Sequence, residues 1–405
     1  MKITDIKFFV SNPSRNFVTV KIETDAGHYG LGDATLNGRE MAVLAYLKEH
    51  IKPCLIGKDA HQIEDIWQYL YKGAYWRRGP ITMTAIAGID MALWDLKGKA
   101  AGLPVYQLLG GKSRSKIKVY GHANGNSIAE TLQHLGKLIG QGYQAVRLQC
   151  AIPGLAGTYG TLADKKDYFD LQSNRPLPPE QPWDTNNYLN FIPTLFQKAR
   201  EQYGQEIQLL HDVHSRLTPI EAARLGNALA PFHLLFLEDP VTAENQANYQ
   251  LIRQHTTTPL ATGEVFNSIW DAKELIETQS IDFIRSAATH SGGITAMKKL
   301  ANFAAIYKIQ MAPHGPPDIS PIGHAAHAHL NMWAPNFGIQ EFIGFGSEKM
   351  NKVFHHPLRF EAGHLYLTDA PGLGVDFDEK EASKYPYKRS YLPVSRLADG
   401  TLWDW

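Results

Sequence analysis

The sequence predicts an α/β protein: a (β/α)8 barrel of the TIM type preceded by an α+β capping domain. The chain has 405 residues, whereas such a barrel alone takes about 250, which leaves room for a second unit. The first part of the chain mixes strand-like and helix-like periods, and residues from about 116 onward repeat a strand, loop and helix pattern. We count eight repeats, the number that closes this kind of barrel.

Residues 1–115 are expected to form the capping domain. Apolar and polar residues alternate along Phe17–Ile22, and the turn residues Asp25-Ala26-Gly27 follow, which indicates an antiparallel meander. Farther on the apolar period becomes helical, at Ile63, Ile66, Trp67 and Leu70. Residues 360–405 return to strand and turn signals, so we expect this last segment to complete the capping domain.

Residues 116–359 are expected to form the barrel. The apolar runs begin near Ile117, Ala145, Gln208, Leu234, Pro259, Ile281, Lys308 and Ile339. Most neighbouring starts lie about one βα unit apart, roughly 30 residues. The second and third starts lie much farther apart, and residues 151–185 between them contain five prolines and little periodicity. Because this segment leaves the carboxyl end of the second strand, it is expected to be an active-site insertion.

Composition excludes several classes of partner. The chain has 40 Lys plus Arg and 40 Asp plus Glu, so it lacks the positive charge that binds nucleic acid or anionic membranes. Its apolar runs are shorter than the roughly 18 residues of a membrane span, and its first residues lack the apolar core of a signal peptide. Two cysteines, Cys54 and Cys150, do not make a disulfide scaffold and fit a reducing compartment. A cytoplasmic location is expected.

Three carboxylates end consecutive predicted strands. Asp212, Glu238 and Glu264 follow one another at intervals of 26 residues, one βα unit each. They should therefore lie side by side at the carboxyl-terminal mouth of the barrel, where barrel enzymes keep their chemistry. Each residue taken singly also has a structural explanation: Asp212 could cap a helix, and Glu238 and Glu264 could be charges on the rim of the barrel. Three in register favour a cation, and all-oxygen ligands suit one Mg²⁺ per site.

This carboxylate set, on a barrel that follows an α+β cap, resembles the enolase superfamily. The resemblance extends to the returning segment Pro371-Gly372-Leu373-Gly374. It implies abstraction of a proton α to a carboxylate, with Mg²⁺ neutralising the charge that develops on the carboxylate oxygens.

The residues at the predicted mouth indicate which members of the superfamily this chain resembles. Racemase and cycloisomerase members carry Lys-x-Lys at the end of strand two, whereas this chain has Arg147-Leu148-Gln149, and arginine does not release its proton. Two candidates for proton transfer remain. His214 lies two residues beyond Asp212, on the same face of its strand, and Tyr159 lies in the insertion. A nearby Arg147 and a cation would lower the tyrosine pKa.

In these residues, Arg147, Tyr159 and His214, the chain resembles the mannonate dehydratase family. The resemblance implies Tyr159 with Arg147 as the base and His214 as the acid, with Asp212, Glu238 and Glu264 as metal ligands. It also implies polar contacts to an acid sugar from Asn37, His122, Glu264, Arg285, His314, Asp318 and Glu341, with Trp405 reaching over the site. Family members are usually multimeric, so a homo-oligomer is expected.

The implied reaction converts D-mannonate, D-gluconate or both to 2-keto-3-deoxy-D-gluconate. Pro316, within His314-Gly315-Pro316-Pro317-Asp318, resembles a subgroup of weak dehydratases, some of them named starvation-sensing or galactonate-dehydratase-like proteins. Because proline restricts the backbone, it can displace its neighbours and lower the rate. Two alternatives stay open: a sugar-acid sensor without turnover, and a dehydratase or epimerase of another acid sugar.

Overall fold

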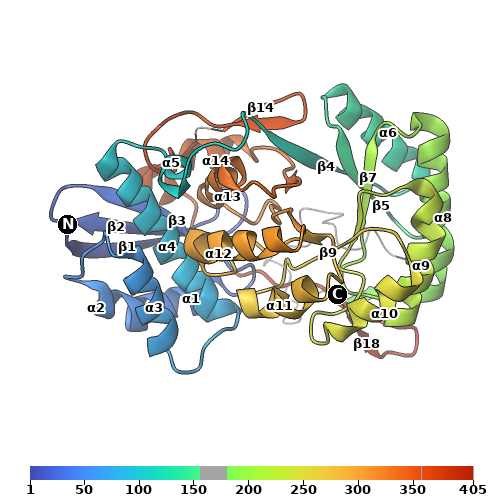
Figure 1. Ribbon diagram of the computed structural model, residues 1–405, viewed down its shortest axis with the longest axis horizontal. Helices are drawn as coiled ribbons and strands as arrows, with labels where there is room; N and C mark the ends of the chain where they lie inside the picture. Colours follow the sequence, from blue (N-terminus) through green and yellow to red (C-terminus); the bar gives the residue numbers. More distant parts are fainter. Residues whose placement is uncertain (156–179, 357, 405) are drawn as a thin grey trace.

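A computed structural model describes residues 1–155, 180–356 and 358–404 of the chain. A cap lies at the end that carries the N-terminus, and a (β/α)8 barrel occupies the rest (Figure 1), which confirms the predicted fold class. Among the helices in the described ranges, none is both long enough and apolar enough to span a membrane.

The cap begins with the predicted antiparallel meander. Its three strands pair in the order β1 (Ile3–Ser11), β2 (Phe17–Thr24) and β3 (Tyr29–Asp33), and Gly27 takes a positive φ of 76° in the turn between β2 and β3. The helical part follows, with α1 (Glu40–Tyr46), the π-helical turn η1 (Leu47–Ile51), α2 (Lys52–Leu55), α3 (Ile63–Gly73), α4 (Pro80–Ala101) and α5 (Val105–Leu109).

Two glycines of β3 bring that strand against α4. A Cβ atom added at Gly30 would lie 1.9 Å from the carbonyl oxygen of Ala92, and one at Gly32 would lie 1.8 Å from that of Gly88. Only residues without a side chain permit this approach. The glycine cluster near residue 30 is therefore a packing feature of the cap.

The eight predicted barrel strands are present and run parallel. They are β4 (Ile117–Gly125), β5 (Ala145–Cys150), β7 (Gln208–Asp212), β8 (Phe236–Glu238), β9 (Leu260–Thr262), β10 (Phe283–Ile284), β11 (Gln310–Met311) and β12 (Gln340–Glu341). Strand β12 pairs with β4. Met311 N donates to Asn336 O at 2.9 Å, and Gly338 N donates to Met311 O at 2.9 Å, so the segment that leads into β12 joins β11 and completes the ring.

Helices cover the outside of the barrel. They are α6 (Ile128–Gly140), α8 (Thr185–Tyr203), α9 (Pro219–Leu229) with the short 3₁₀ turn η2 (Ala230–Phe232), α10 (Ala247–His255), α11 (Ile269–Glu277), α12 (Gly293–Ile306) and α13 (Pro321–Trp333). Helix α9 begins at Pro219, as its sequence predicts, and Thr218 with Glu221 forms a capping box before it.

The C-terminal part of the chain contacts three regions. Helix α14 (Glu348–Val353) leads into β13 (Phe354–His355), which pairs with β16 (Asp376–Phe377), and the hairpin of β14 (Arg359–Glu361) and β15 (His364–Tyr366) pairs with barrel strand β4. Helix α15 (Glu379–Ala382) reaches the cap, where Glu379 accepts from Lys21. Finally β17 (Val394–Arg396) and β18 (Leu402–Trp403) form a sheet with β6 (Glu180–Pro182) at the end of the insertion, in the order β18-β17-β6.

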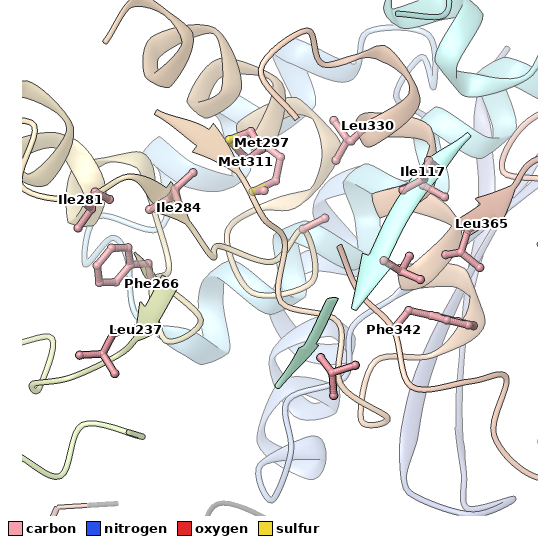
Figure 2. Packing of buried hydrophobic residues seen from close by; sticks show 14 of the residues in the cluster. Ile117, Leu237, Phe266, Ile281, Ile284, Met297, Met311, Leu330, Phe342 and Leu365 are labelled. Carbon is pink, nitrogen blue, oxygen red and sulfur yellow. The ribbon is translucent and has the colours of Figure 1, made fainter. Parts of the chain in front are cut away.

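Two buried layers hold the barrel. The larger lies between strands and helices, where Leu237, Ile284 and Met297 are packed (Figure 2). The smaller lies inside the ring and takes one side chain from each strand or its adjoining residue: Tyr120, Ala145, Leu210, Phe236, Ala261, Phe283, Ala312 and Ile339. Aromatic and small residues alternate through much of this layer, as a filled barrel interior requires. It forms a floor beneath the carboxyl ends of the strands.

The cap is joined to the mouth of the barrel by buried and partly buried polar contacts. Asp33, at the end of β3, accepts from Ser320 N at 2.7 Å, and Asn37 Nδ2 donates to Asp318 at 3.1 Å. The indole of Trp67 on α3 donates to the carbonyl of Gly292 at 2.7 Å. These contacts fix the cap against the loops that follow β10 and β11.

Candidate active site

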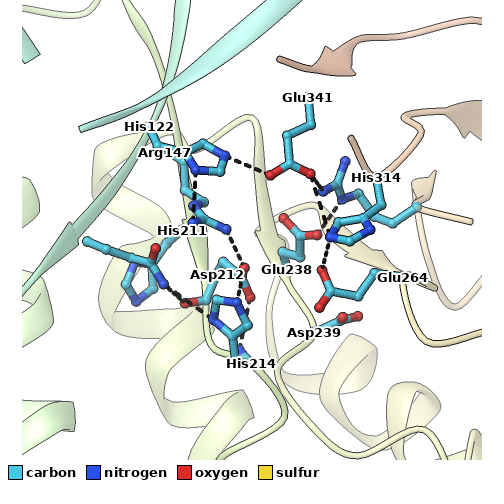
Figure 3. A network of polar contacts seen from close by, with 12 residues as sticks. His122, Arg147, His211, Asp212, His214, Glu238, Asp239, Glu264, His314 and Glu341 are labelled. Atoms are coloured by element: carbon cyan, nitrogen blue, oxygen red, sulfur yellow. Dashed lines mark hydrogen bonds and ion pairs between the residues drawn. The ribbon is translucent and has the colours of Figure 1, made fainter. Parts of the chain in front are cut away.

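The three predicted carboxylates meet at the carboxyl ends of neighbouring strands. Asp212 and Glu238 end β7 and β8 and are ladder partners, and Glu264 follows β9. One oxygen of each lies within 4.8 Å of the other two. Figure 3 shows them close together, with His314 and Glu341 on one side and Arg147 and His214 on the other.

The electrostatics of this cluster fit a divalent cation. Asp212 and Glu238 are completely buried, and Oε2 of Glu238 has no hydrogen-bond partner among the described residues. Burial, reinforced by the neighbouring carboxylates, raises the pKa of Glu238 and of Glu264 well above the ordinary value. A bound cation would supply the missing partner and favour the ionised forms.

Two buried arginines flank the cluster. Arg147 on β5 donates to Asp212 Oδ2 at 2.7 Å and contacts Nδ1 of His122 at 3.1 Å. Arg285, directly after β10, is fully buried and contacts Glu238, Glu341 and the carbonyl of Ala312. Neither guanidinium can serve as a proton acceptor, so both act as fixed positive charges.

Glu341 connects the last strand of the barrel to the first. Its carboxylate lies 2.8 Å from His122 Nε2 and 2.6 Å from Arg285 Nη2, and it accepts from Gly315 N at 3.0 Å. Burial opposes ionisation, but Arg285, with His314 and His122 nearby, holds the pKa of Glu341 well below its usual range. The site therefore contains one carboxyl whose pKa is lowered, Glu341, beside three whose pKa values burial raises.

Two histidines face the carboxylates from opposite sides. His214 Nε2 lies 3.1 Å from Asp212 Oδ2, and its Nδ1 lies 3.3 Å from Nε2 of Gln149. Burial first, then Arg147, lowers the pKa of His214 well below its ordinary value. His314 Nε2 lies 3.4 Å from Glu264 Oε2, and burial lowers the pKa of His314 to about 3. Both rings are therefore neutral at neutral pH in the ligand-free protein.

The structure thus gathers most of the predicted residues around one mouth. Asn37 of the cap joins it through Asp318, as described above. Tyr159 and Trp405 lie outside the described residues, as do residues 156–179 of the predicted insertion, so their parts in the site remain predictions.

Two supporting residues, His211 and Asp239, are not apparent from sequence spacing. His211 lies between Tyr188 Oη, at 2.8 Å from its Nε2, and the carbonyl of Leu148, at 2.9 Å from its Nδ1, so it ties α8 to the strand that carries Arg147. Asp239 is buried behind the ligands and accepts from Gly263 N at 3.3 Å. The sequence signal that could have identified Asp239 is its place directly after Glu238. A buried charge needs partners, so two consecutive acidic residues at a strand end indicate a polar site.

A cavity of about 560 Å³ opens at the other end of the barrel. Residues at the starts of the strands line it, among them Gln208, Pro259 and Gln310. Because the carboxylates lie at the opposite ends of these strands, this cavity is separate from the candidate site, and the inner layer lies between them.

Comparison with known proteins agrees with this geometry. Residues 8–110 match the family described as mandelate racemase / muconate lactonizing enzyme, N-terminal domain, and residues 192–381 match the family described as enolase C-terminal domain-like. The chain is 57% identical to a D-mannonate dehydratase of Sphingomonas sp. (strain SKA58) and 56% identical to the D-galactonate dehydratase family member RspA of Halomonas elongata, covering 100% of each chain. Its fold superimposes with a TM-score of 0.91 on an enolase from Pantoea ananatis solved with bound D-gluconate and Mg, at 40% identity, covering 100% of this chain and 99% of that one.

Proposed function

The chain belongs to the enolase superfamily, and on this premise we propose that it is a Mg²⁺-dependent dehydratase of acid sugars acting on D-mannonate, D-gluconate or both. The observation that carries the proposal is the buried cluster of Asp212, Glu238 and Glu264, flanked by Arg147 and His214. The relatives named as mannonate and galactonate dehydratases support the hydro-lyase class.

Asp212, Glu238 and Glu264 would hold the metal. Mg²⁺, when bound there, supplies the positive charge that neutralises negative charge developing on the substrate carboxylate as the C2 proton leaves. Glu341 and Arg285 fix the opposite wall through their buried ion pair, and His122 and His314 present ring nitrogens toward the same space. This ring of polar groups suits a hydroxylated chain and would be left unpaired around an apolar substrate.

The proton transfers are assigned to Tyr159 and His214. With D-mannonate, Tyr159, paired with Arg147, would remove the C2 proton, and His214 would protonate the C3 hydroxyl as it departs, because hydroxide is a poor leaving group. The ring is neutral in the ligand-free protein, so His214 must take up a second proton before this step and donate it from the imidazolium form. Water is lost and the product becomes 2-keto-3-deoxy-D-gluconate. The ring of His214 is held at both nitrogens, because Gln149 Nε2 lies 3.3 Å from Nδ1 and Asp212 Oδ2 lies 3.1 Å from Nε2.

D-Gluconate is the C2 epimer, so its C2 proton faces the opposite wall. We assign His214 as the base for this substrate. Deuterium exchange at C2 of gluconate should then persist in Tyr159→Phe and disappear in His214→Asn. The reverse pattern would overturn this assignment.

Low efficiency is part of the proposal. Pro316 lies two residues from both His314 and Asp318, in the loop that Glu341 holds through Gly315 N. Since proline restricts the backbone, a small displacement of His314 is expected to reduce the rate, and misplacement by about 1 Å costs on the order of 100-fold.

The test is incubation of the purified protein and Mg²⁺ with a panel of acid sugars, assayed for 2-keto-3-deoxy product. Glu238→Gln should abolish product, whereas Glu348→Gln, the same change at an exposed helix position, should leave it unchanged. No product from any sugar while Mg²⁺ is bound would favour a sensor without turnover. An epimer formed without a ketone would favour the epimerase. Light scattering of the same preparation tests the expected homo-oligomer.

A further inference from the structure

The turn that carries His214 has an unusual backbone. His214 and the next residue, Ser215, both have positive φ angles, 52° and 61°. Non-glycine residues rarely take this left-handed conformation, because Cβ approaches the carbonyl oxygen, and two in succession need support from the surrounding structure. The orientation of the His214 ring therefore depends on whatever holds this turn.

One side of the turn is held by the neighbouring strand. Val213 N donates to Glu238 O at 3.0 Å, and Ser215 N donates to Asp239 O at 2.7 Å. His214 N donates to the Asp212 side chain at 2.9 Å. These contacts come from the end of β8 and from Asp212, and they fix the beginning of the turn.

The other side is held by the C-terminal sheet. The indole N–H of Trp403 on β18 donates to the carbonyl oxygen of Arg216 at 2.9 Å. The guanidinium of Arg216, which is 1% exposed, lies 5.2 Å from the ring centre of Trp183 and 3.5 Å from the carbonyl oxygen of His214. Arg216 is thus contacted at its backbone by one tryptophan and at its side chain by another.

Both tryptophans belong to one structural unit. Trp183 directly follows β6, and its backbone N–H donates to the carbonyl oxygen of Arg396 on β17 at 2.7 Å. Strand β17 pairs with both β6 and β18. Arg396 Nε also lies 3.0 Å from Glu180. The last residues of the chain and the end of the insertion therefore act on the same arginine.

We propose that Arg216, contacted by Trp183 and Trp403, is a positioning residue that keeps the His214–Ser215 turn left-handed and so orients the imidazole of His214 toward the substrate. The C-terminal hairpin would then act on catalysis through Arg216. The inference rests on the proposed function for its kinetic consequence, but the hold on the turn is a property of the free protein.

The decisive variant is Trp403→Phe, which removes the indole N–H and keeps an aromatic ring. Trp67→Phe is the matched control, because it removes an indole N–H that also donates to a backbone carbonyl, at 2.7 Å, but to Gly292 in the loop after β10 and not to the turn that carries His214. Leu402→Ala, at an exposed neighbour on β18, controls for disturbance of the hairpin itself. Trp183→Leu removes the ring beneath Arg216 and gives a second, independent test.

The first readout needs no substrate. Hydrogen exchange followed by mass spectrometry on the metal-free protein should show faster deuterium uptake in peptides spanning residues 213–217 for Trp403→Phe and Trp183→Leu. Uptake there should be unchanged in Trp67→Phe and Leu402→Ala. Equal uptake in all five proteins, wild type included, would overturn the proposed hold whether or not the protein is a dehydratase.

The second readout is kinetic. With D-mannonate, kcat of Trp403→Phe should fall by about 10-fold or more with KM nearly constant, since a misaimed group loses transition-state stabilisation. Exchange of the C2 hydrogen with D₂O should fall less than dehydration, because only the departing hydroxyl uses His214. A loosened turn with unchanged kcat, or an equal loss of C2 exchange and dehydration, would overturn the positioning role. Absence of product from the wild type would instead contradict the proposed function. The hydrogen-exchange experiment would then decide by itself whether Trp183 and Trp403 stabilise the turn.

Discussion

Replacing Glu264 with glutamine is expected to stabilise the metal-free protein at alkaline pH, although it removes a side chain from the proposed metal site. Ligand oxygens of the three carboxylates lie within 4.8 Å of one another. Two unit charges about 5 Å apart repel by about 3 kcal/mol at an effective dielectric constant near 20. Protonation sets a ceiling, since keeping a glutamic acid neutral at pH 8 costs at most about 5 kcal/mol. We therefore expect a gain of about 2–4 kcal/mol in unfolding free energy at pH 8.

The sign of the pH dependence follows from the direction of the pKa shift. Burial, with neighbouring carboxylates, raises the folded-state pKa of Glu264 above its unfolded value. A raised carboxyl pKa favours the folded state below the unfolded pKa and loses that contribution as pH rises toward the folded pKa. The advantage of Glu264→Gln should accordingly be close to zero near pH 4 and should increase through the neutral range.

Urea unfolding in the presence of a chelator, at several pH values between 5 and 8, measures this directly. Glu341→Gln is the matched control in the same site, because its carboxylate is held by Arg285, His122 and Gly315 N. This control should lose about 3 kcal/mol or more at pH 8, the opposite sign. Adding Mg²⁺ should stabilise the wild type and have much less effect on Glu264→Gln.

Two results would refute this reasoning. One is a Glu264→Gln protein no more stable than the wild type at pH 8 without metal. The other is a gain that does not change with pH, because a packing effect, unlike relief of charge repulsion, does not titrate.

Three further predictions concern single residues. Arg285→Met should lower the metal-free unfolding free energy by about 3–5 kcal/mol, since two buried carboxylates lose their partner; an unchanged urea midpoint would contradict this. Pro316→Ala should raise kcat/KM on D-mannonate by about 10-fold, and an unchanged value in steady-state assays would show that the loop is already well placed. His329 is buried, burial lowers its pKa to about 4, and its Nδ1 accepts a backbone N–H. The unfolding free energy should therefore fall by about 3 kcal/mol as the pH drops from about 6.5 to 4. His329→Asn should flatten that part of the pH curve, and urea titrations of the variant that superimpose on those of the wild type would argue against this reasoning.

The barrel could be predicted because its signals are local and repeated. Each strand start lies within two residues of the structural one, and the interval of 26 residues placed Asp212, Glu238 and Glu264 on adjacent strands. Strand alternation predicted that His214 lies on the same side as Asp212, and its ring does lie beside that carboxylate. The physical reason is different, because β7 ends at Asp212 and His214 follows it in a left-handed turn. These inferences need only the period of a strand and the length of a βα unit.

The rest depended on contacts between distant parts of the chain. Glu341 meets His122 only because the last strand closes on the first, and no local pattern gives the geometry of that closure. The path of the C-terminal hairpin over Arg216 is likewise nonlocal, because β17 pairs with residues more than 200 positions earlier. The left-handed backbone at His214 has no sequence signal, since neither it nor Ser215 is glycine.

The alternating floor of the barrel has a consequence for how such a protein can change. Ala261 lies in the same layer as Phe236 and Phe283, whose ring centres are 5.1 Å apart. A larger side chain at Ala261 has no room unless one of these rings becomes smaller in the same variant. Substitutions in the floor should therefore be strongly epistatic and tolerated mainly as compensating pairs. The loops at the mouth of the barrel are free of this packing constraint. A library designed to alter the substrate range should therefore vary these loops and leave the floor residues unchanged.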